Sequence, residues 1–132
     1  MTAASIRARV RAEMTDEIKN VARRHLATDG ANLSLRAVAR DLGMASSAVY
    51  RYFASRDDLL TAMIIDAYDA LGSTAEAAVG GKEVPFTDRF LSACHAVRDW
   101  ALENPHEWAL IYGSPVPGYQ AQIGRASCRE RV

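Results

Sequence analysis

The chain has 132 residues, 49% hydrophobic and 24% charged, which is typical of one small soluble domain or of a head with part of a second unit. Its 16 basic and 16 acidic residues cancel, which argues against a basic nucleic-acid-coating protein and against an acidic tail protein. No apolar run approaches the roughly 20 residues of a membrane span, and two cysteines are too few for a disulfide framework, so we expect a cytoplasmic protein without membrane contact.

One long amphipathic helix is predicted at the start of the chain. Apolar residues recur at three- and four-residue spacing from Ile6 to Leu26, which is typical of a helix with one buried face. We expect this helix to span roughly residues 5–28 and to stop at Gly30. Arg7, Arg9 and Arg11 fit either an arm that follows a DNA groove or a disordered charged tail.

Two short helices are predicted next, separated by a glycine. Ser34 is a suitable N-cap for a helix that carries an apolar pattern up to Leu42, and Gly43 ends this helix. A second short helix is expected to extend as far as Phe53. Two short helices around a glycine-containing turn are the signature of a helix-turn-helix, although a plain helical hairpin shows the same generic pattern.

Three further helices are predicted in the rest of the chain. The first begins at Ser55 as its cap and carries an apolar stripe from Leu59 to Leu71. The second has Pro85 as its first residue, and the third has Asn104 as its cap followed by Pro105. No segment alternates like a strand, so the predicted fold class is all-α, with a three-helix head followed by a partial helical body.

The segment LSLRAVARDLGMASSAVYRYFASRDDLL resembles the DNA-binding head of TetR-type transcriptional regulators. It has the helix-turn-helix, the Tyr-x-x-Phe pattern from Tyr50 to Phe53, and a basic step at Arg56 into the next helix. The resemblance covers about residues 5–72, and the stretch 100–119 resembles the start of the ligand-binding body in one branch of the family. It implies a sequence-specific DNA-binding regulator, expected to be a repressor that a small apolar effector releases from its operator.

The resemblance also implies which residues bind DNA. Ser34 would donate to a phosphate, Arg36 would reach a base or a phosphate, and Arg56 would hold the backbone. Ala48 departs from the threonine or glycine often found there, and its methyl group could touch only a thymine methyl or leave space. Tyr50 could instead be partly buried by packing, with a hydroxyl that still reaches out, and Arg51 could be a solvated charge. The expected DNA-binding residues are Ser34, Arg36, Ser46, Ser47, Ala48, Tyr50, Arg51, Tyr52 and Arg56.

The body is expected to bind the effector in a pocket of hydrophobic and aromatic side chains. For each candidate residue taken singly, plain core packing is the favoured interpretation. Partners implied by the resemblance are double-stranded DNA with a palindromic operator and, for the complete protein, a second copy of the chain. The alternative is a helical protein-interaction module that does not bind DNA. The candidate pocket residues are Phe90, Cys94, Trp100, Trp108 and Tyr112.

No cofactor, metal site or enzymatic activity is expected. His25, His95 and His106 lack the spacing of a metal site, and Cys94 and His95 point in different directions because they are adjacent on one helix. No nucleophile elbow or phosphate-binding loop is present in the sequence.

The expected domains are a DNA-binding head at residues 1–54, a truncated effector-binding body at 55–122 and a non-native tail at 123–132. The tail changes charge abruptly and resembles a translated sequencing adaptor, although a genuine basic tail has the same composition. Residues 1–60 carry 10 basic and 7 acidic side chains, whereas residues 61–122 carry 3 and 8. The positive charge is therefore concentrated in the part that is expected to meet DNA.

Overall fold

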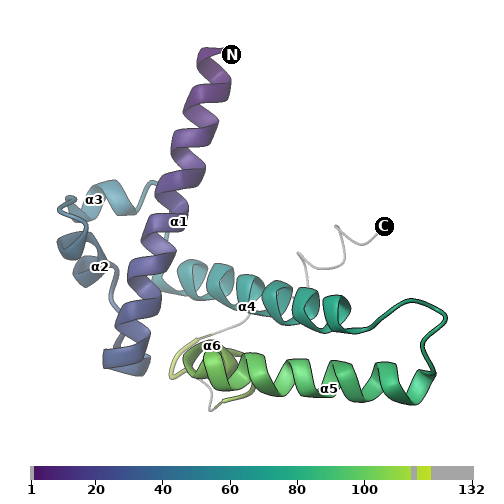
Figure 1. Cartoon of the computed structure of the whole chain (residues 1–132). Helices are drawn as coiled ribbons and strands as arrows, with labels where there is room; N and C mark the ends of the chain where they lie inside the picture. Colours follow the sequence, from purple (N-terminus) through teal and green to yellow (C-terminus); the bar gives the residue numbers. More distant parts are fainter. Residues whose placement is uncertain (1, 114–115, 120–132) are drawn as a thin grey trace. The chain divides into compact units, whose positions relative to one another are not determined.

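The computed structural model describes residues 2–113 and 116–119, and all of its regular structure is helical (Figure 1). The predicted all-α fold is therefore confirmed for these residues, whereas the predicted tail at 123–132 lies outside them. The chain forms two compact units, and the boundary between them lies within the fourth helix. We call residues 2–63 with 116–119 the head and residues 64–113 the body. The elements are α1 (Ala3–Asp29), a 3₁₀ turn (Gly30–Asn32), α2 (Leu35–Asp41), α3 (Ser46–Val49), α4 (Arg56–Ala78), α5 (Phe86–Glu103) and α6 (Pro105–Tyr112).

The long first helix is buried along only part of its length. Thr2 caps α1, with its side-chain oxygen accepting a hydrogen bond from the amide of Ser5 at 3.2 Å. The apolar face is buried only from Ile18 onward, whereas Ile6 and Val10 are 42% and 50% exposed. The N-terminal turns of α1 extend past α2 and α3 (Figure 1). These turns are helical, so the alternative of a disordered charged tail is wrong.

The first helix of the α2–α3 unit has the predicted N-cap. Ser34 accepts a hydrogen bond from the amide of Ala37 at 3.5 Å, and this bond satisfies one of the free amides at the start of α2. Val38, Ala39 and Val49 are all at most 1% exposed, so the two helices share a buried contact with the rest of the head. Only a small side chain such as that of Ala39 leaves room for a close approach of helices.

The second helix of this unit is shorter than predicted. We expected it to continue to Phe53, but α3 ends at Val49 and the chain continues as a hydrogen-bonded turn. The amides of Tyr52 and Phe53 both donate to the carbonyl of Val49, at 2.9 and 3.1 Å. This tightening of the final turn places Phe53 in the core, where it is 7% exposed.

Gly43 stands at the turn because its backbone is left-handed, with φ of 67°. Nothing lies within 4 Å of a Cβ atom built at this position, so a side chain would meet backbone strain without a steric clash. We expect Gly43→Ala to lower the free energy of unfolding by about 1–2 kcal/mol, and Gly43→Asn to lower it less.

Gly72 is the matched control for this prediction, to be compared in urea denaturation followed by circular dichroism. It lies inside α4, and a Cβ atom there also meets nothing within 4 Å. Gly72→Ala should stabilise the chain by about 1 kcal/mol because alanine favours a helix over glycine. If both alanine variants shift the unfolding midpoint in the same direction, the backbone explanation for Gly43 is contradicted.

The body is a helical hairpin, α4 with α5, followed by the short α6 (Figure 1). Its core cluster contains Trp100, which is 8% exposed, and the partly buried Trp108. These side chains pack with residues from all three helices, so the cluster joins the later turns of α4 to α5 and α6. Its other members are Ala67, Leu71, Val97 and Ile111.

The two proline signals of the body were predicted with different success. Pro105 is the first residue of α6, as predicted, but α5 starts at Phe86 with Pro85 as its N-cap. The prediction that the Asn104 side chain caps α6 is wrong. That side chain instead donates to the carbonyl of Trp100 at 3.0 Å and so helps to terminate α5.

Candidate nucleic-acid interface

The outward surface of the α2–α3 unit carries most of the residues predicted to bind DNA. Arg36 on α2, Ser47 on α3 and Arg51 just after α3 are exposed. Tyr50 is 47% exposed, which agrees with the alternative of partial burial and leaves part of its side chain on the surface. Ser46 and Ala48 are half-buried at the start of α3. A short helix with small residues at its start and larger polar residues after it can approach base edges closely.

Ser34 has a structural role that leaves room for a second one. Its hydroxyl oxygen accepts from the amide of Ala37, so it fixes the start of α2. A serine hydroxyl also has one proton to donate. The cap therefore leaves Ser34 able to donate that proton to a phosphate oxygen.

Arg56 lies in the first turn of α4, where the head also receives the chain segment that follows α6. Its Nη1 donates to the carbonyl of Pro117 at 3.5 Å, and nearby the hydroxyls of Thr61 and Tyr119 are 2.8 Å apart. The Ser55 side chain accepts from the amide of Asp58 at 3.1 Å and so caps α4, as predicted. The predicted phosphate-binding arginine is thus held on a capped helix start within the head.

Tyr52 differs from Tyr50 because it is half-buried and has a charged neighbour from α1. The guanidinium of Arg11 lies 5.0 Å from the centre of the Tyr52 ring. The same guanidinium donates through Nη2 to the carbonyl of Arg51 at 2.9 Å. We did not predict this contact, because the sequence signals were local whereas these residues lie 40 positions apart.

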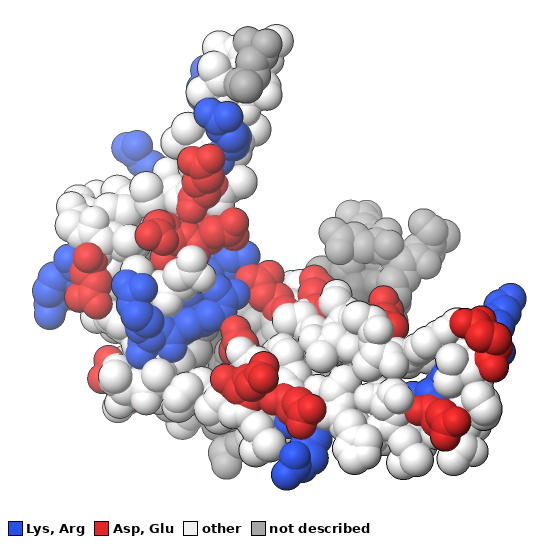
Figure 2. All heavy atoms as spheres, in the orientation of Figure 1, with Lys and Arg blue, Asp and Glu red and all other residues white. Residues whose placement is uncertain are grey.

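Charge and polar contacts differ between the two units. In the face shown in Figure 2, Lys and Arg are prominent over α1 and α2, mixed with acidic residues, whereas Asp and Glu predominate over α4 to α6.

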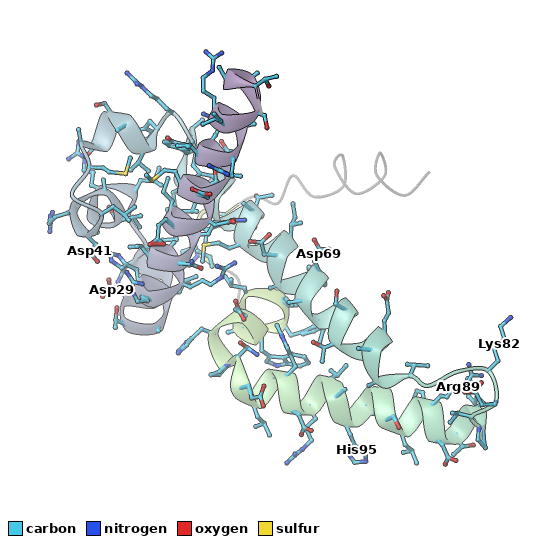
Figure 3. The ribbon with its side chains drawn as sticks, turned by 45° about the horizontal axis from the view of Figure 1, so that its top comes forward. Asp29, Asp41, Asp69, Lys82, Arg89 and His95 are labelled. Atoms are coloured by element: carbon cyan, nitrogen blue, oxygen red, sulfur yellow. The ribbon has the colours of Figure 1, made fainter. Side chains whose placement is uncertain are left out.

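Within the head, the Nε2 atom of His25 lies 2.5 Å from an oxygen of Asp41. This pair connects the last turns of α1 to the end of α2; Figure 3 labels Asp41 on α2 and Asp29 at the end of α1. Asp41 is therefore paired within the head.

The structure brings together only some of the residues predicted to bind an effector. Trp100 and Trp108 share the body's core cluster, and the rings of Trp108 and Tyr112 are 4.5 Å apart. Phe90 is 58% exposed and stacks on Phe86, while Cys94 is exposed on the same helix. The five residues do not form one lined site in the body.

The described residues offer few signs of other site types. Among residues 2–113 and 116–119, no three His, Cys, Asp or Glu side chains are grouped so that they could hold a metal ion. None of the helices in the same part of the chain combines the length and apolar character needed to cross a membrane. The α2–α3 surface remains the strongest candidate for a functional site.

Comparison with known proteins matches both units of the chain. Residues 18–63 match the family of bacterial regulatory proteins named after TetR, and residues 90–131 match the C-terminal domain of proteins like the tetracycline repressor. The first match covers the second half of α1, the α2–α3 unit and the start of α4. The second match begins within α5.

Individual relatives agree with these matches. The HTH-type transcriptional regulators Rv1816 of Mycobacterium tuberculosis and Mb1846 of Mycobacterium bovis are each 48% identical over 119 residues. That alignment covers 89% of this chain and 51% of each relative, so the chain spans about half the length of the curated relatives it matches.

A solved structure gives the same result in three dimensions. SCO4313, described as a regulatory protein, superimposes with a TM-score of 0.81 at 39% identity, over 91% of this chain and 57% of its own. Two family matches, two relatives and one structure therefore agree with the resemblance carried by residues 33–60. The chain belongs to the TetR family of bacterial regulatory proteins.

Proposed function

We propose that this chain is a DNA-binding transcriptional regulator that places α3 in the major groove of its operator. The observation that carries the proposal is the division of the α2–α3 unit into two faces. Val38, Ala39 and Val49 are buried, whereas Arg36 and Arg51 are exposed and free to approach DNA. A helix-turn-helix reads base edges with such an outward surface.

The residues of the outward surface divide into two kinds of contact. Ser46, Ser47 and Ala48 are small and occupy the start of α3, where they can reach base edges and a thymine methyl group. Tyr50 and Arg51 follow them and suit phosphate oxygens, which position a protein without reading sequence. Arg36, exposed at the start of α2, is the residue on this surface whose charge and reach best suit a base edge.

The complete protein, in this proposal, is a cytoplasmic homodimer that represses transcription by occupying a palindromic operator. Residues 1–60 carry 10 basic and 7 acidic side chains, which is a modest positive charge for holding a duplex. Two heads on one operator double the phosphate contacts. A two-fold symmetric dimer also matches a palindromic site, with half-sites one helical turn or a multiple of it apart.

Release of the operator, rather than an enzymatic step, is the proposed role of the body. An apolar effector that binds one body conformation better than another would shift the equilibrium between them. Both tryptophans of the chain, Trp100 and Trp108, lie in the body. An effector that changes the tryptophan fluorescence and lowers operator affinity would support this role. An effector that lowers operator affinity but leaves the tryptophan fluorescence unchanged would contradict binding at this cluster.

The experiment for DNA binding is a gel shift with a salt titration. The probes are the duplex that the chain enriches from a randomised 20-base-pair library and an unselected duplex of equal length. Binding should be tight at low salt and weaken steeply as salt rises, because phosphate contacts release counterions. Absence of binding to either duplex at low salt would contradict the proposal and favour an interaction module without DNA binding.

A further inference from the structure

Arg11 connects α1 to the turn that follows α3. Its Nη2 atom donates to the carbonyl of Arg51 at 2.9 Å, and its guanidinium carbon lies 5.0 Å from the centre of the Tyr52 ring. The neighbouring arginines of α1 interact within their own helix. Arg7 donates to the carbonyl of Ala3 at 3.3 Å, and Arg9 lies 3.6 Å from Glu13.

The contact matters because the helix that it secures is very short. α3 has four residues, and so short a helix depends on tertiary contacts for its stability. Its inner side is held by the buried side chains of Val49 and Phe53. The last carbonyls of a helix have no partner within the helix, and a cation near them also complements the helix dipole. Arg51 lies two residues after α3, and Arg11 gives its carbonyl a hydrogen-bond partner and places a positive charge beside the turn that follows the helix.

The stacking of Arg11 on Tyr52 also restricts the orientation of the two side chains. A guanidinium over an aromatic face is attracted by the electrons of the ring, and its planar fork holds one orientation. Tyr52 is half-buried beneath Arg11, between the exposed Arg51 and the buried Phe53. Arg11 therefore acts on the backbone and on the ring of the same two residues, Arg51 and Tyr52.

We infer that Arg11 is a positioning residue of the DNA interface, which orients Arg51 and Tyr52 without itself being a phosphate contact. The inference rests on the proposed function for its DNA-binding consequence. Its structural part concerns the free protein and can be tested without DNA. An arm that follows a groove would give Arg11 the opposite role, as a direct contact.

The first experiment measures amide hydrogen exchange in the free chain for Arg11→Met and Arg9→Met. Both variants remove one charge from the same helix, but of these two arginines Arg11 is the one that contacts the turn after α3. We expect exchange at Tyr52 and Phe53 to become about tenfold faster in Arg11→Met and to stay unchanged in Arg9→Met, a change on the scale of one charge-assisted hydrogen bond. Equal exchange in the two variants would overturn the inference whether or not the chain binds DNA.

The second experiment measures affinity for the selected duplex at several salt concentrations. Arg11→Met should bind about tenfold more weakly than Arg9→Met, with the same dependence of affinity on salt. Arg11→Lys keeps the charge but lacks the planar fork, so it should recover less than half of the loss on a logarithmic scale. A lower salt slope in Arg11→Met, by about 0.9, would show a lost phosphate contact and overturn the inference.

A double-mutant cycle with Tyr52→Leu tests whether Arg11 acts through the ring. If it does, Arg11→Met should weaken DNA binding about threefold less in the Tyr52→Leu background than in the wild type, because the stacking partner is gone. Fully additive effects would overturn that part of the inference. Failure of the wild-type chain to bind either duplex would refute the proposed function, and hydrogen exchange would still decide the structural role of Arg11.

Discussion

Ile18→Ala is expected to lower the free energy of unfolding by about 2–5 kcal/mol, because it removes buried methyl groups and leaves a cavity. Ile18 is fully buried on α1, at the level where this helix meets the rest of the head. A small domain is stable by only about 5–15 kcal/mol. A loss of this size therefore leaves a measurable unfolded fraction of the head and weakens DNA binding through folding alone.

Ile6 provides the matched control, since it is the same residue type on the same helix and is 42% exposed. We expect Ile6→Ala to change the free energy of unfolding by less than about 0.5 kcal/mol, as for most surface substitutions. Urea denaturation followed by far-ultraviolet circular dichroism measures both. Similar losses in the two variants would mean that the N-terminal turns of α1 are buried in solution, contrary to the structure.

Arg36→Ala is expected to weaken binding to the selected duplex by about 10- to 100-fold, which is about 1–3 kcal/mol and the usual size of a base contact. Arg36 is exposed on α2 and is the arginine of the outward surface that we assign to a base edge. Binding to the unselected duplex should fall less. The ratio of the two affinities, which measures specificity, should therefore decrease.

Arg98 is the control for this substitution. It lies on α5 in the body, where its side chain is 70% exposed and 3.7 Å from Asp99. Arg98→Ala removes the same charge but should leave the specificity ratio unchanged. Fluorescence anisotropy with both duplexes measures the ratio. If Arg36→Ala weakens both duplexes equally and lowers the salt slope by about 1, Arg36 contacts a phosphate and not a base.

The features that the sequence predicted well are those with local causes. Ser34 is predictable as a cap because capping is local: its side chain bonds to an amide only three residues ahead. Gly43 is predictable as the turn residue because glycine enters a left-handed turn without strain. The all-α fold followed from apolar spacing in the same way. Such signals depend on neighbours in the chain, which a sequence displays directly.

The features that the sequence did not predict depend on contacts between distant residues. The spacing of Ile6 and Val10 matches a buried stripe, yet burial requires a partner, and those turns extend past α2 and α3. Asn104 has a side chain that can cap a helix start, but its side-chain amide donates to the carbonyl of Trp100 instead. The contact between Arg11 and Tyr52 joins two segments whose approach only the fold determines.

The interface itself was predicted residue by residue from a family resemblance, and its roles in binding stay predictions. The structure adds the exposed fraction of each side chain. It distinguishes the more exposed Tyr50 from the half-buried Tyr52, although both belong to the same Tyr-x-x-Phe segment. The body was predicted less well. Aromatic residues at helical spacing do not reveal whether they line a pocket, and Trp100 lies in a core cluster while Phe90 is exposed.

Contact between DNA and the surface formed by α2 and α3 can be tested directly by recording the amide resonances of the chain while the selected duplex is added. If this surface meets DNA, the largest changes fall on residues 34–36, 46–52 and 56, and the resonances of α5 and α6 change little. Changes concentrated on α5 and α6, with residues 46–52 unaffected, would contradict contact at this surface.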